Sequence, residues 1–443
     1  MLEKDKSDLG ILEALRDPEI LSLGWHKILS NRILKKAKKD EKLQKSIVEK
    51  LLGDEIPSIS ISSTNLPENT MFIYLQELID DILFYILQKN NVCQIKCSKK
   101  FLLCGVELLE NLNKQRSLVY NNQSTENITK EFDTLSKKWG KILPDNIKNL
   151  IREKEKIIIS PDSKCSLLPF EVLSLDNQPL CFDKTVVRAT SFHSFMSIMN
   201  RKYHFGSCLI VGNPWPRSYQ KKFEYFLPNN DERKYIINYL DNAISEAETL
   251  TRLLPNSTLL IKDKATGDKF ISEISKHSLI HFAGHGSVGR ILFLSGPLTS
   301  LQSSFEPNEF FNLRKAERVY GNNRVNMMQD WHPVTDLDLY DTELVEGSVI
   351  FLNACETGVQ KYIGGGFYQG LPSVFIKNGA YAVITTSMPI FESSSKDFAI
   401  HFYNEFLKSH SVGCSVKKAR LYVRERYAVP VHWAPFVHYG LPE

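Results

Sequence analysis

Two apolar stretches decide the fold of this chain, Ile280–Gly286 (IHFAGHG) and Val349–Gly358 (VIFLNACETG). Each reads as a continuous apolar run, which is typical of a strand buried inside a parallel sheet. Each also ends in a reactive side chain, the imidazole of His285 or the thiol of Cys355. Because ligands of open parallel sheets bind beyond the carboxyl ends of the strands, the sequence predicts that these two side chains meet over one site.

Further strand-like runs lie around these two stretches and alternate with helical patterns. The runs are Lys156–Asp162, Ser207–Pro214, Ser278–Phe282, Ser348–Leu352 and Tyr381–Thr386. Helical patterns follow or separate them at Ile244–Leu254, Gly267–Ser275, Gly370–Asn378 and Lys396–Ser409. This alternation predicts an α/β domain over residues 151–443, with a mostly parallel sheet flanked by helices.

The first 150 residues show helical patterns in place of strand-like runs. Apolar residues recur at helical spacing over Leu12–Leu52, Thr70–Gln88, Phe101–Val119 and Ile128–Ile151. The sequence therefore predicts an all-helical region, residues 1–150, ahead of the α/β domain. Its lysine-rich stretch, Lys35–Lys50, is interrupted by acidic residues, which favours a solvated helix face over a nucleic-acid site.

Composition limits the class of protein. The chain has 443 residues, 42% of them hydrophobic and 24% charged, as in an ordinary soluble globular protein. Its formal net charge of +4 is too small to indicate nucleic-acid binding by itself. No apolar stretch approaches the ~20 residues of a membrane span, and the charged N-terminus leads into no signal peptide, so a cytoplasmic protein is expected.

The scattered cysteines favour free thiols over disulfides.

His285 and Cys355 together suit nucleophilic catalysis. A thiol attacks as its thiolate, which a nearby imidazole favours. Gly286 is expected to aim its backbone N–H into the site, and the N–H of Cys355 is a second candidate donor, so the pair would form an oxyanion hole. The residues alone also allow a strand-end histidine and a buried core thiol.

Two other motifs bear on cofactors. His281 and His285 form an H-x-x-x-H pair, which on a helix, with Glu after the first His, would suggest zinc. Here Phe282 follows His281 and the segment reads as a strand. Gly364–Gly366 lacks the Lys-Ser/Thr that completes a phosphate loop. No metal and no cofactor are therefore expected.

The H-F-A-G-H-G and L-N-A-C-E-T-G segments resemble the two active-site motifs of CHAT-domain peptidases, in the caspase-like and separase-like clan of cysteine proteases. The resemblance covers about residues 150–443, including Ile157–Ser174 (IIISPDSKCSLLPFEVLS), Ser207–Pro214 (SCLIVGNP), Gly365–Thr385 (GGFYQGLPSVFIKNGAYAVIT) and His432–Gly440 (HWAPFVHYG). It implies a caspase-like fold and peptide-bond cleavage. His285 would be the general base, Cys355 the nucleophile, and the N–H groups of Gly286 and Cys355 the oxyanion donors.

The substrate pocket departs from this family pattern. Met388 stands where many members have an aromatic residue, and Glu392 where the family often has an acidic one. An acidic group in the pocket would select Arg or Lys before the cleaved bond. Asp341, Glu343 and Glu356 are rival candidates, and a solvated loop position is the alternative for each acid.

Two strand residues and one long segment near the dyad are further candidates for a role in the site. His281 and Asn353, in the strands before the reactive residues, are candidates for support of the dyad. Residues 289–334 read as a long, polar, irregular segment between the two motifs, and such segments are often functional. We expect this segment to cover the site as an inhibitory or substrate-binding loop.

The resemblance also implies a setting. Members of this kind act in prokaryotic antiviral defence or regulated cell death and cleave a partner protein, which is often encoded nearby. Residues 1–150 would then bind an activating or inhibitory partner, with no membrane involved and nucleic acid at most indirectly. The alternatives are a non-catalytic CHAT scaffold and a small-amide acyl-transfer enzyme that uses the same dyad.

Overall fold

The computed structural model describes residues 66–89, 91–161, 163–216, 222–226, 234–287, 291–295, 317–320, 323–326, 331–336, 338–364 and 367–443. The helix expected over Leu12–Leu52 lies outside these residues. The described residues fall into two compact units. The first unit runs to Arg201 and includes Gln360–Gln369 and His401–Glu443, and the second unit comprises Lys202–Val359 and Gly370–Ile400. The domain boundary at residue 150 stays a prediction.

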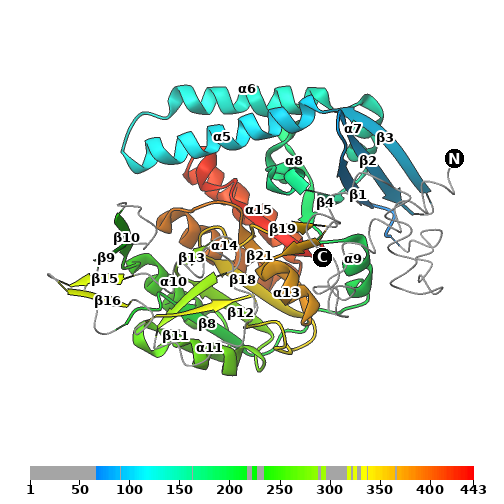
Figure 1. Ribbon diagram of the computed structural model, residues 1–443. Coiled ribbons are helices and arrows are strands. Elements are labelled where there is room, and N and C mark those ends of the chain that lie inside the picture. The colour runs from blue at the N-terminus through cyan, green and yellow to red at the C-terminus, as the bar shows by residue number, and fades with distance from the viewer. Residues whose placement is uncertain are drawn as a thin grey trace. The chain divides into compact units, whose positions relative to one another are not determined.

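A parallel sheet forms the centre of the second unit (Figure 1). Its strands lie in the order β11 (Ser257–Ile261), β8 (Cys208–Gly212), β12 (Leu279–Ala283), β18 (Ser348–Asn353) and β21 (Ala380–Thr386). Each neighbouring pair is parallel, and every residue of β12 and β18 is buried. The predicted α/β fold with a mostly parallel sheet is confirmed.

Helices cover both faces of this sheet, which explains why its strands are apolar throughout. They are α10 (Asp241–Leu253), α11 (Gly267–Ile274) and α13 (Leu371–Lys377). Neighbouring residues of β12 point to opposite faces. His281 contacts Glu246 of α10, and Phe282 packs edge-on against Phe270 of α11.

The first unit has a mixed set of strands. Their order is β22 (Phe436–Gly440), β7 (Thr185–Arg188), β4 (Lys156–Pro161), β1 (Thr70–Glu77), β2 (Asp81–Gln88) and β3 (Asn91–Ser98). The first four are parallel to one another. The last three form an antiparallel meander.

The helix predicted over Thr70–Gln88 is wrong, and so is an all-helical region of residues 1–150. The segment folds back as β1 and β2, with Tyr74 opposite Tyr85. Within it, Thr70–Leu75 and Ile82–Leu87 are buried throughout, whichever face of the sheet they point to. The apolar run therefore carries no period that separates a helix from a strand. Its β-branched and aromatic residues favour a pleated surface.

The helices expected further along the first unit are confirmed, with one break. They are α5 (Lys100–Tyr120), α6 (Glu126–Ile142) and α7 (Asp145–Glu153). The predicted helix Ile128–Ile151 is divided because Pro144 disfavours helical angles at Leu143 and has no N–H to donate. Phe101 of α5 and Trp139 of α6 are both buried, with ring centroids 5.2 Å apart, and join the two helices.

The remaining α-helices and strands of the described residues are as follows. The helices are α8 (Leu180–Asp183), α9 (Phe192–Ile198), α14 (Glu392–Ser409) and α15 (Val412–Arg426). The strands are β5 (Ser174–Leu175), β6 (Gln178–Pro179), β9 (Lys222–Phe226), β10 (Lys234–Asn238), β13 (Gly286–Ser287), β14 (Ile291–Ser295), β15 (Glu317–Tyr320), β16 (Asn323–Asn326), β17 (Trp331–Thr335), β19 (Lys361–Gly364) and β20 (Phe367–Gln369). Because β14 to β17 fall within or at the end of residues 289–334, the irregular structure expected there is wrong for these parts. The rest of that segment lies outside the described residues.

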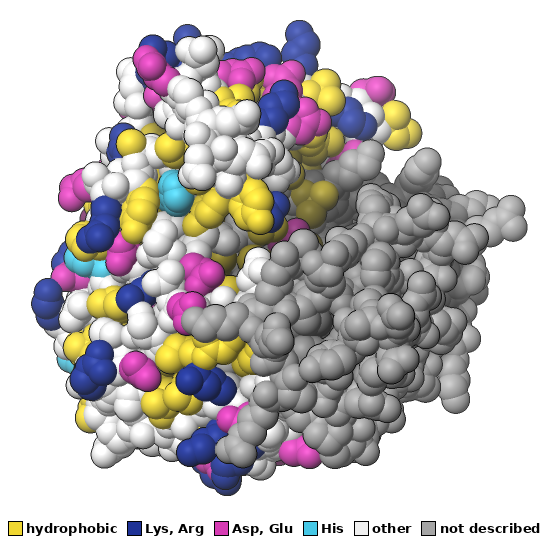
Figure 2. Space-filling view, turned by 90° about the vertical axis from the view of Figure 1, so that its left-hand side faces the viewer, with side chains coloured by type: hydrophobic (Ala, Val, Ile, Leu, Met, Phe, Trp, Pro, Cys, Tyr) yellow, Lys and Arg dark blue, Asp and Glu magenta, His cyan; other side chains and the backbone are white. Residues whose placement is uncertain are grey.

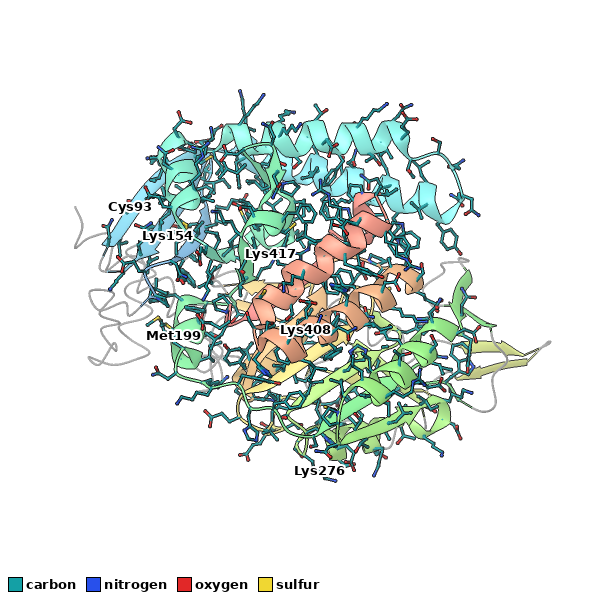
Figure 3. All side chains as sticks on the ribbon, turned by 180° about the vertical axis from the view of Figure 1, so that it is seen from behind. Cys93, Lys154, Met199, Lys276, Lys408 and Lys417 are labelled. Atoms are coloured by element: carbon teal, nitrogen blue, oxygen red, sulfur yellow. The ribbon has the colours of Figure 1, made fainter. Side chains whose placement is uncertain are left out.

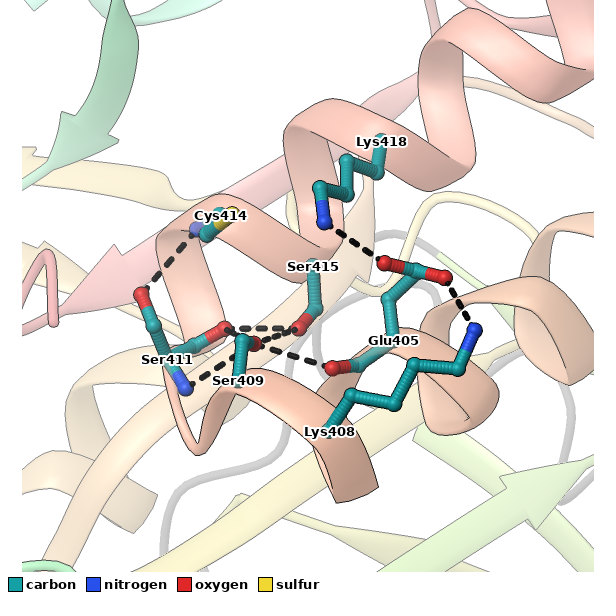
Figure 4. Close-up of polar contacts among 7 residues, drawn as sticks. All are labelled: Glu405, Lys408, Ser409, Ser411, Cys414, Ser415 and Lys418. Carbon is teal, nitrogen blue, oxygen red and sulfur yellow. Dashed lines mark hydrogen bonds and ion pairs between the residues drawn. The ribbon is translucent and has the colours of Figure 1, made fainter.

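The corner between α14 and α15 is held by polar contacts (Figure 4). The carboxylate of Glu405 accepts from Lys408 and from Lys418, both at 2.7 Å. These hydrogen bonds, the one from Lys408 first, lower the pKa of Glu405 to about 2. Ser411 caps α15, since its Oγ accepts from the N–H of Cys414 at 3.3 Å.

All eight cysteines are free thiols, as predicted. Cys93 lies on β3, at the end of the strand order in the first unit (Figure 3). Burial raises the pKa of Cys97, on the same strand, to about 11. Thiols of this kind are unreactive near neutral pH, because the thiolate is the reactive form.

Acid should destabilise this protein through two histidines of the first unit. Burial lowers the pKa of His438 to about 3 and that of His432 to about 4. Both rings are then neutral in the fold but bind protons when unfolded, starting near pH 6.5. The free energy of unfolding should therefore fall as the pH drops from about 6.5 to 5, by up to about 1.4 kcal/mol per pH unit for each ring.

Urea unfolding at several pH values measures this slope, in a range above most carboxylate titrations. His438→Phe removes one titrating ring and should flatten it. An equal slope in the variant would show that His438 is not neutral in the fold.

Candidate active site

Strand register brings the two reactive residues to the same level. β12 pairs with β18 from Leu279 opposite Val349 to Ala283 opposite Asn353. His285 and Cys355 each lie two residues beyond the last of these pairs. They therefore follow the carboxyl ends of adjacent parallel strands, the place where open sheets bind ligands.

Gly286 lies against the turn that carries the thiol. A Cβ atom placed on Gly286 would lie 3.0 Å from the carbonyl oxygen of Cys355, 3.1 Å from the Cβ of Ala354 and 2.8 Å from the Cγ2 of Thr357. These distances show that the segments after β12 and β18 touch. They also explain the glycine sterically, because any larger residue would push the two segments apart.

Two threonines hold the turn after β18. The Thr357 hydroxyl donates to the carbonyl oxygens of Leu352 and Ala354, at 3.2 and 3.0 Å. The hydroxyl of Thr386, at the end of β21, donates to the same Ala354 oxygen at 2.6 Å. The backbone at Glu356 is left-handed, with φ of 57°, so the chain leaves the strand directly after Cys355. Neither threonine was predicted from the sequence, since a hydroxyl near a turn is a weak signal.

The imidazole of His285 is oriented by a backbone carbonyl. Its Nε2 lies 2.8 Å from the oxygen of Asn238, at the end of β10. Because a carbonyl only accepts, Nε2 carries the proton and the neutral ring has its lone pair on Nδ1. Burial lowers the pKa of His285, and the Asn238 hydrogen bond opposes this only in part. The ring is therefore a neutral base at pH 7.

The sequence does not reveal this partner of His285, because every residue type has a carbonyl group. Trp215, which follows β8, is a further aromatic neighbour, with its ring centroid 6.4 Å from that of His285. Tyr239 packs edge-on against Trp215 at 5.3 Å.

A buried carboxyl group joins the two residues expected to support the dyad. Glu246, on α10, has an exposed fraction of 2%. Its Oε1 accepts from Asn353 Nδ2 at 2.7 Å and lies 2.8 Å from His281 Nε2. Glu246 falls within the helix predicted over Ile244–Leu254, but the sequence does not mark it as part of a site, because an acid on an amphipathic helix is usually solvated.

Four candidates for the substrate pocket lie in different environments. Met388 is buried, and Asp341 is exposed while Glu356 is partly so. Glu392, at the start of α14, accepts from the N–H of Asn242 in the first turn of α10, at 3.2 Å. Burial raises the pKa of Glu392. The contacts of the described residues do not join these four side chains into one cluster, and their roles stay predictions.

An alanine at Gly286 tests the contact between the two segments. Gly286→Ala should slow the alkylation of Cys355 by iodoacetamide about 100-fold, since a shift of about 1 Å has an effect of that size. The free energy of unfolding should fall by about 1–3 kcal/mol through overpacking. Peptide-resolved mass spectrometry measures the labelling rate of this one thiol.

Gly206→Ala is the control, because a Cβ there would meet Ser278 Oγ, at 3.0 Å, before any other atom. Gly206 precedes β8, at the amino end of the strand. An unchanged labelling rate in Gly286→Ala would mean that the two segments separate without effect on the thiol.

No three His, Cys, Asp or Glu side chains of the described residues gather as ligands for a metal ion. No described helix has both the length and the apolar character that crossing a membrane requires. Where side chains are coloured in Figure 2, acidic and basic groups are interspersed on the face shown.

Comparisons with known proteins agree on the fold. A family model of the CHAT domain matches residues 134–441. The Saccharomyces cerevisiae separase–securin complex at 3.0 Å resolution matches with a TM-score of 0.55 and 12% identity, over 92% of this chain and 33% of that chain. The same complex at 2.6 Å gives a TM-score of 0.52 at 12% identity, with the same coverage.

An Arg-specific gingipain R structure matches with a TM-score of 0.41 and 9% identity, over 68% of each chain. No curated protein matches. The chain spans about a third of the length of the separase chains that it matches.

Proposed function

The chain belongs to the CHAT domain family, and from this we propose that it is a cysteine endopeptidase that cleaves a specific partner protein with His285 and Cys355. The register of β12 and β18 carries the proposal, because it sets both residues two positions beyond paired strand ends. The contact of Gly286 with the Cys355 turn adds support. The separase structures support the fold on which this site is built.

In the proposed reaction, Nδ1 of His285 takes the proton of the Cys355 thiol. The thiolate attacks the carbonyl carbon of the scissile peptide bond, and the negative charge moves to the carbonyl oxygen. The backbone N–H groups of Gly286 and Cys355 donate to this oxyanion. The imidazolium then protonates the leaving amine, and a thioester to Cys355 remains.

Water completes the cycle. His285 accepts a proton from water, the hydroxide attacks the thioester, and the thiolate leaves as the acid product forms. Throughout, the carbonyl of Asn238 keeps its hydrogen bond to Nε2–H. It therefore fixes the tautomer and stabilises the imidazolium without a third side chain.

The setting is proposed on the family resemblance. We place the cleavage in a prokaryotic defence or regulated cell-death response in the cytoplasm, against a protein encoded nearby. The matched separase is in complex with another protein, securin, which supports a protein partner for this chain too. Residues 1–150 are the proposed contact region for it.

A comparison of the wild type with Cys355→Ala tests the function. Each is incubated with the proteins encoded beside it, and new N-termini are labelled and identified by mass spectrometry. The proposal expects new N-termini in one or a few proteins, with the wild type alone.

Two outcomes favour the alternatives. Binding to a partner with the same effect from both forms, and no cleavage, indicates a scaffold. Turnover of small amides without protein fragments indicates an acyl-transfer enzyme.

A further inference from the structure

The face of the sheet below the candidate site is covered by α10. A Cβ placed on Gly212 of β8 would lie 2.4 Å from the Cβ of Ala247, so the helix lies almost directly on the strand. His281 of β12 pairs with Ile210 of β8, two positions before Gly212. Because side chains alternate along a strand, His281 points to this same face, where it meets Glu246.

Glu246 contacts both strands with one oxygen atom. Its Oε1 accepts from Asn353 Nδ2, at the last residue of β18. The same oxygen lies 2.8 Å from Nε2 of His281 in β12. A carboxylate oxygen only accepts hydrogen bonds, and a buried carboxylate needs such partners. We therefore assign the proton of the His281 ring to Nε2, as a second donor to this oxygen.

The amide of Asn353 depends on this contact. Its Oδ1 is buried and has no hydrogen-bond partner among the described residues. Glu246 is therefore the group that holds the side chain in place. Removing the carboxyl group would also leave the Nδ2 donor without its partner, a state that buried polar groups rarely adopt.

The backbone connection beyond this point is weak. After the pair Ala283–Asn353, the next link is the N–H of Gly284 to the carbonyl oxygen of Asn353, at 3.4 Å. Backbone hydrogen bonds are most often about 2.9–3.0 Å long. The segments that carry His285 and Cys355 thus begin where the backbone hydrogen bonds between the two strands become long. The side-chain contacts of Glu246 lie just before that point.

We propose that Glu246 is a positioning residue, which ties the ends of β12 and β18 together so that His285 and Cys355 stay at reacting distance. The proposal rests on the proposed function of the dyad. Glu246 acts through the side chains that it contacts, His281 and Asn353, and not as a catalytic residue.

The thiol itself reports on this role without a substrate. Alkylation of Cys355 by iodoacetamide is followed against pH by peptide-resolved mass spectrometry, at a temperature where circular dichroism shows each variant folded. In Glu246→Leu both hydrogen bonds are lost. We expect labelling at pH 7 to slow about 100-fold, as for a misplaced reacting group, and the pH profile to move toward the ordinary thiol pKa of about 8.5.

Glu246→Gln is the conservative variant. Its side-chain oxygen still accepts, so labelling should stay within about 10-fold of the wild type, which is the loss that each 1.4 kcal/mol brings. Asn353→Leu removes the link to β18 alone and should give an intermediate rate. It also tests the proposal if Glu246→Leu does not fold.

Glu171→Gln in the first unit is the matched control. Glu171 is as buried as Glu246 and accepts from Arg188 at 2.7 Å. The change should lower the midpoint of thermal unfolding and leave the labelling of Cys355 unchanged. A lower midpoint with wild-type labelling in Glu246→Leu and Asn353→Leu would overturn the positioning role.

Failure of the proposed function gives a different result. In that case the wild type cleaves no protein, whereas labelling of Cys355 still depends on Glu246. The two ideas are therefore tested separately.

Discussion

Cys355→Ala is expected to reduce peptide cleavage to background, by about a million-fold in kcat, as the loss of a nucleophile does in other proteases. Without the sulfur atom no acyl intermediate forms, and the oxyanion donors alone give little turnover. A peptide that spans the identified cleavage site measures the loss by its kcat/KM. The thiol is only partly buried, so the free energy of unfolding should change by about 1 kcal/mol or less.

Cys414→Ala is the matched control, because it removes the same atoms from another partly buried thiol, at the start of α15. Its activity should equal that of the wild type. Residual cleavage by Cys355→Ala above the level of a mock preparation would show that another residue supplies the nucleophile.

His285→Ala is expected to lower kcat by about 10²–10⁴-fold at pH 7, since general acid–base catalysis contributes on this scale. The thiol then loses the base that takes its proton. Activity should rise with pH toward the ordinary thiol pKa of about 8.5, whereas the wild type needs no such rise. Added imidazole should restore part of the rate, because the substitution leaves space for a ring.

His204→Ala, at an exposed histidine of the same unit, is the control and should keep full activity. Its rate should also be insensitive to imidazole. A wild-type rate in His285→Ala would mean that His285 is not the base, even though the neutral ring faces Asn238.

Long periodic segments could be predicted from the sequence, and the uniformly apolar segment of the first unit could not. The helices α5 and α6 each have a polar face, so their period is visible in the sequence. Thr70–Gln88 is buried on both sides as β1 and β2, and the choice between helix and strand then depends on the neighbouring β4 and β3. The break at Leu143–Pro144 was readable in principle, because proline ends helices for a local steric reason.

The candidate site divides in the same way. His285, Cys355 and Gly286 could be predicted from the motifs, because apolar strands that end beside small residues are a recognisable sequence pattern. The roles of Asn238, Glu246 and Thr386 correspond to no such pattern. Asn238 acts through its carbonyl, Glu246 is one acid among many on helices, and Thr386 ends a strand far along the chain.

By itself, the sequence determined the class of fold, the two strand ends and the residue types that they carry. These properties are local, since they depend on apolar runs, turns and the chemistry of single side chains. The tertiary structure alone decided the register of β12 on β18, the tautomer of His285 and the link through Glu246. Each of these requires atoms distant in sequence to lie within hydrogen-bond range, and no local pattern encodes that distance.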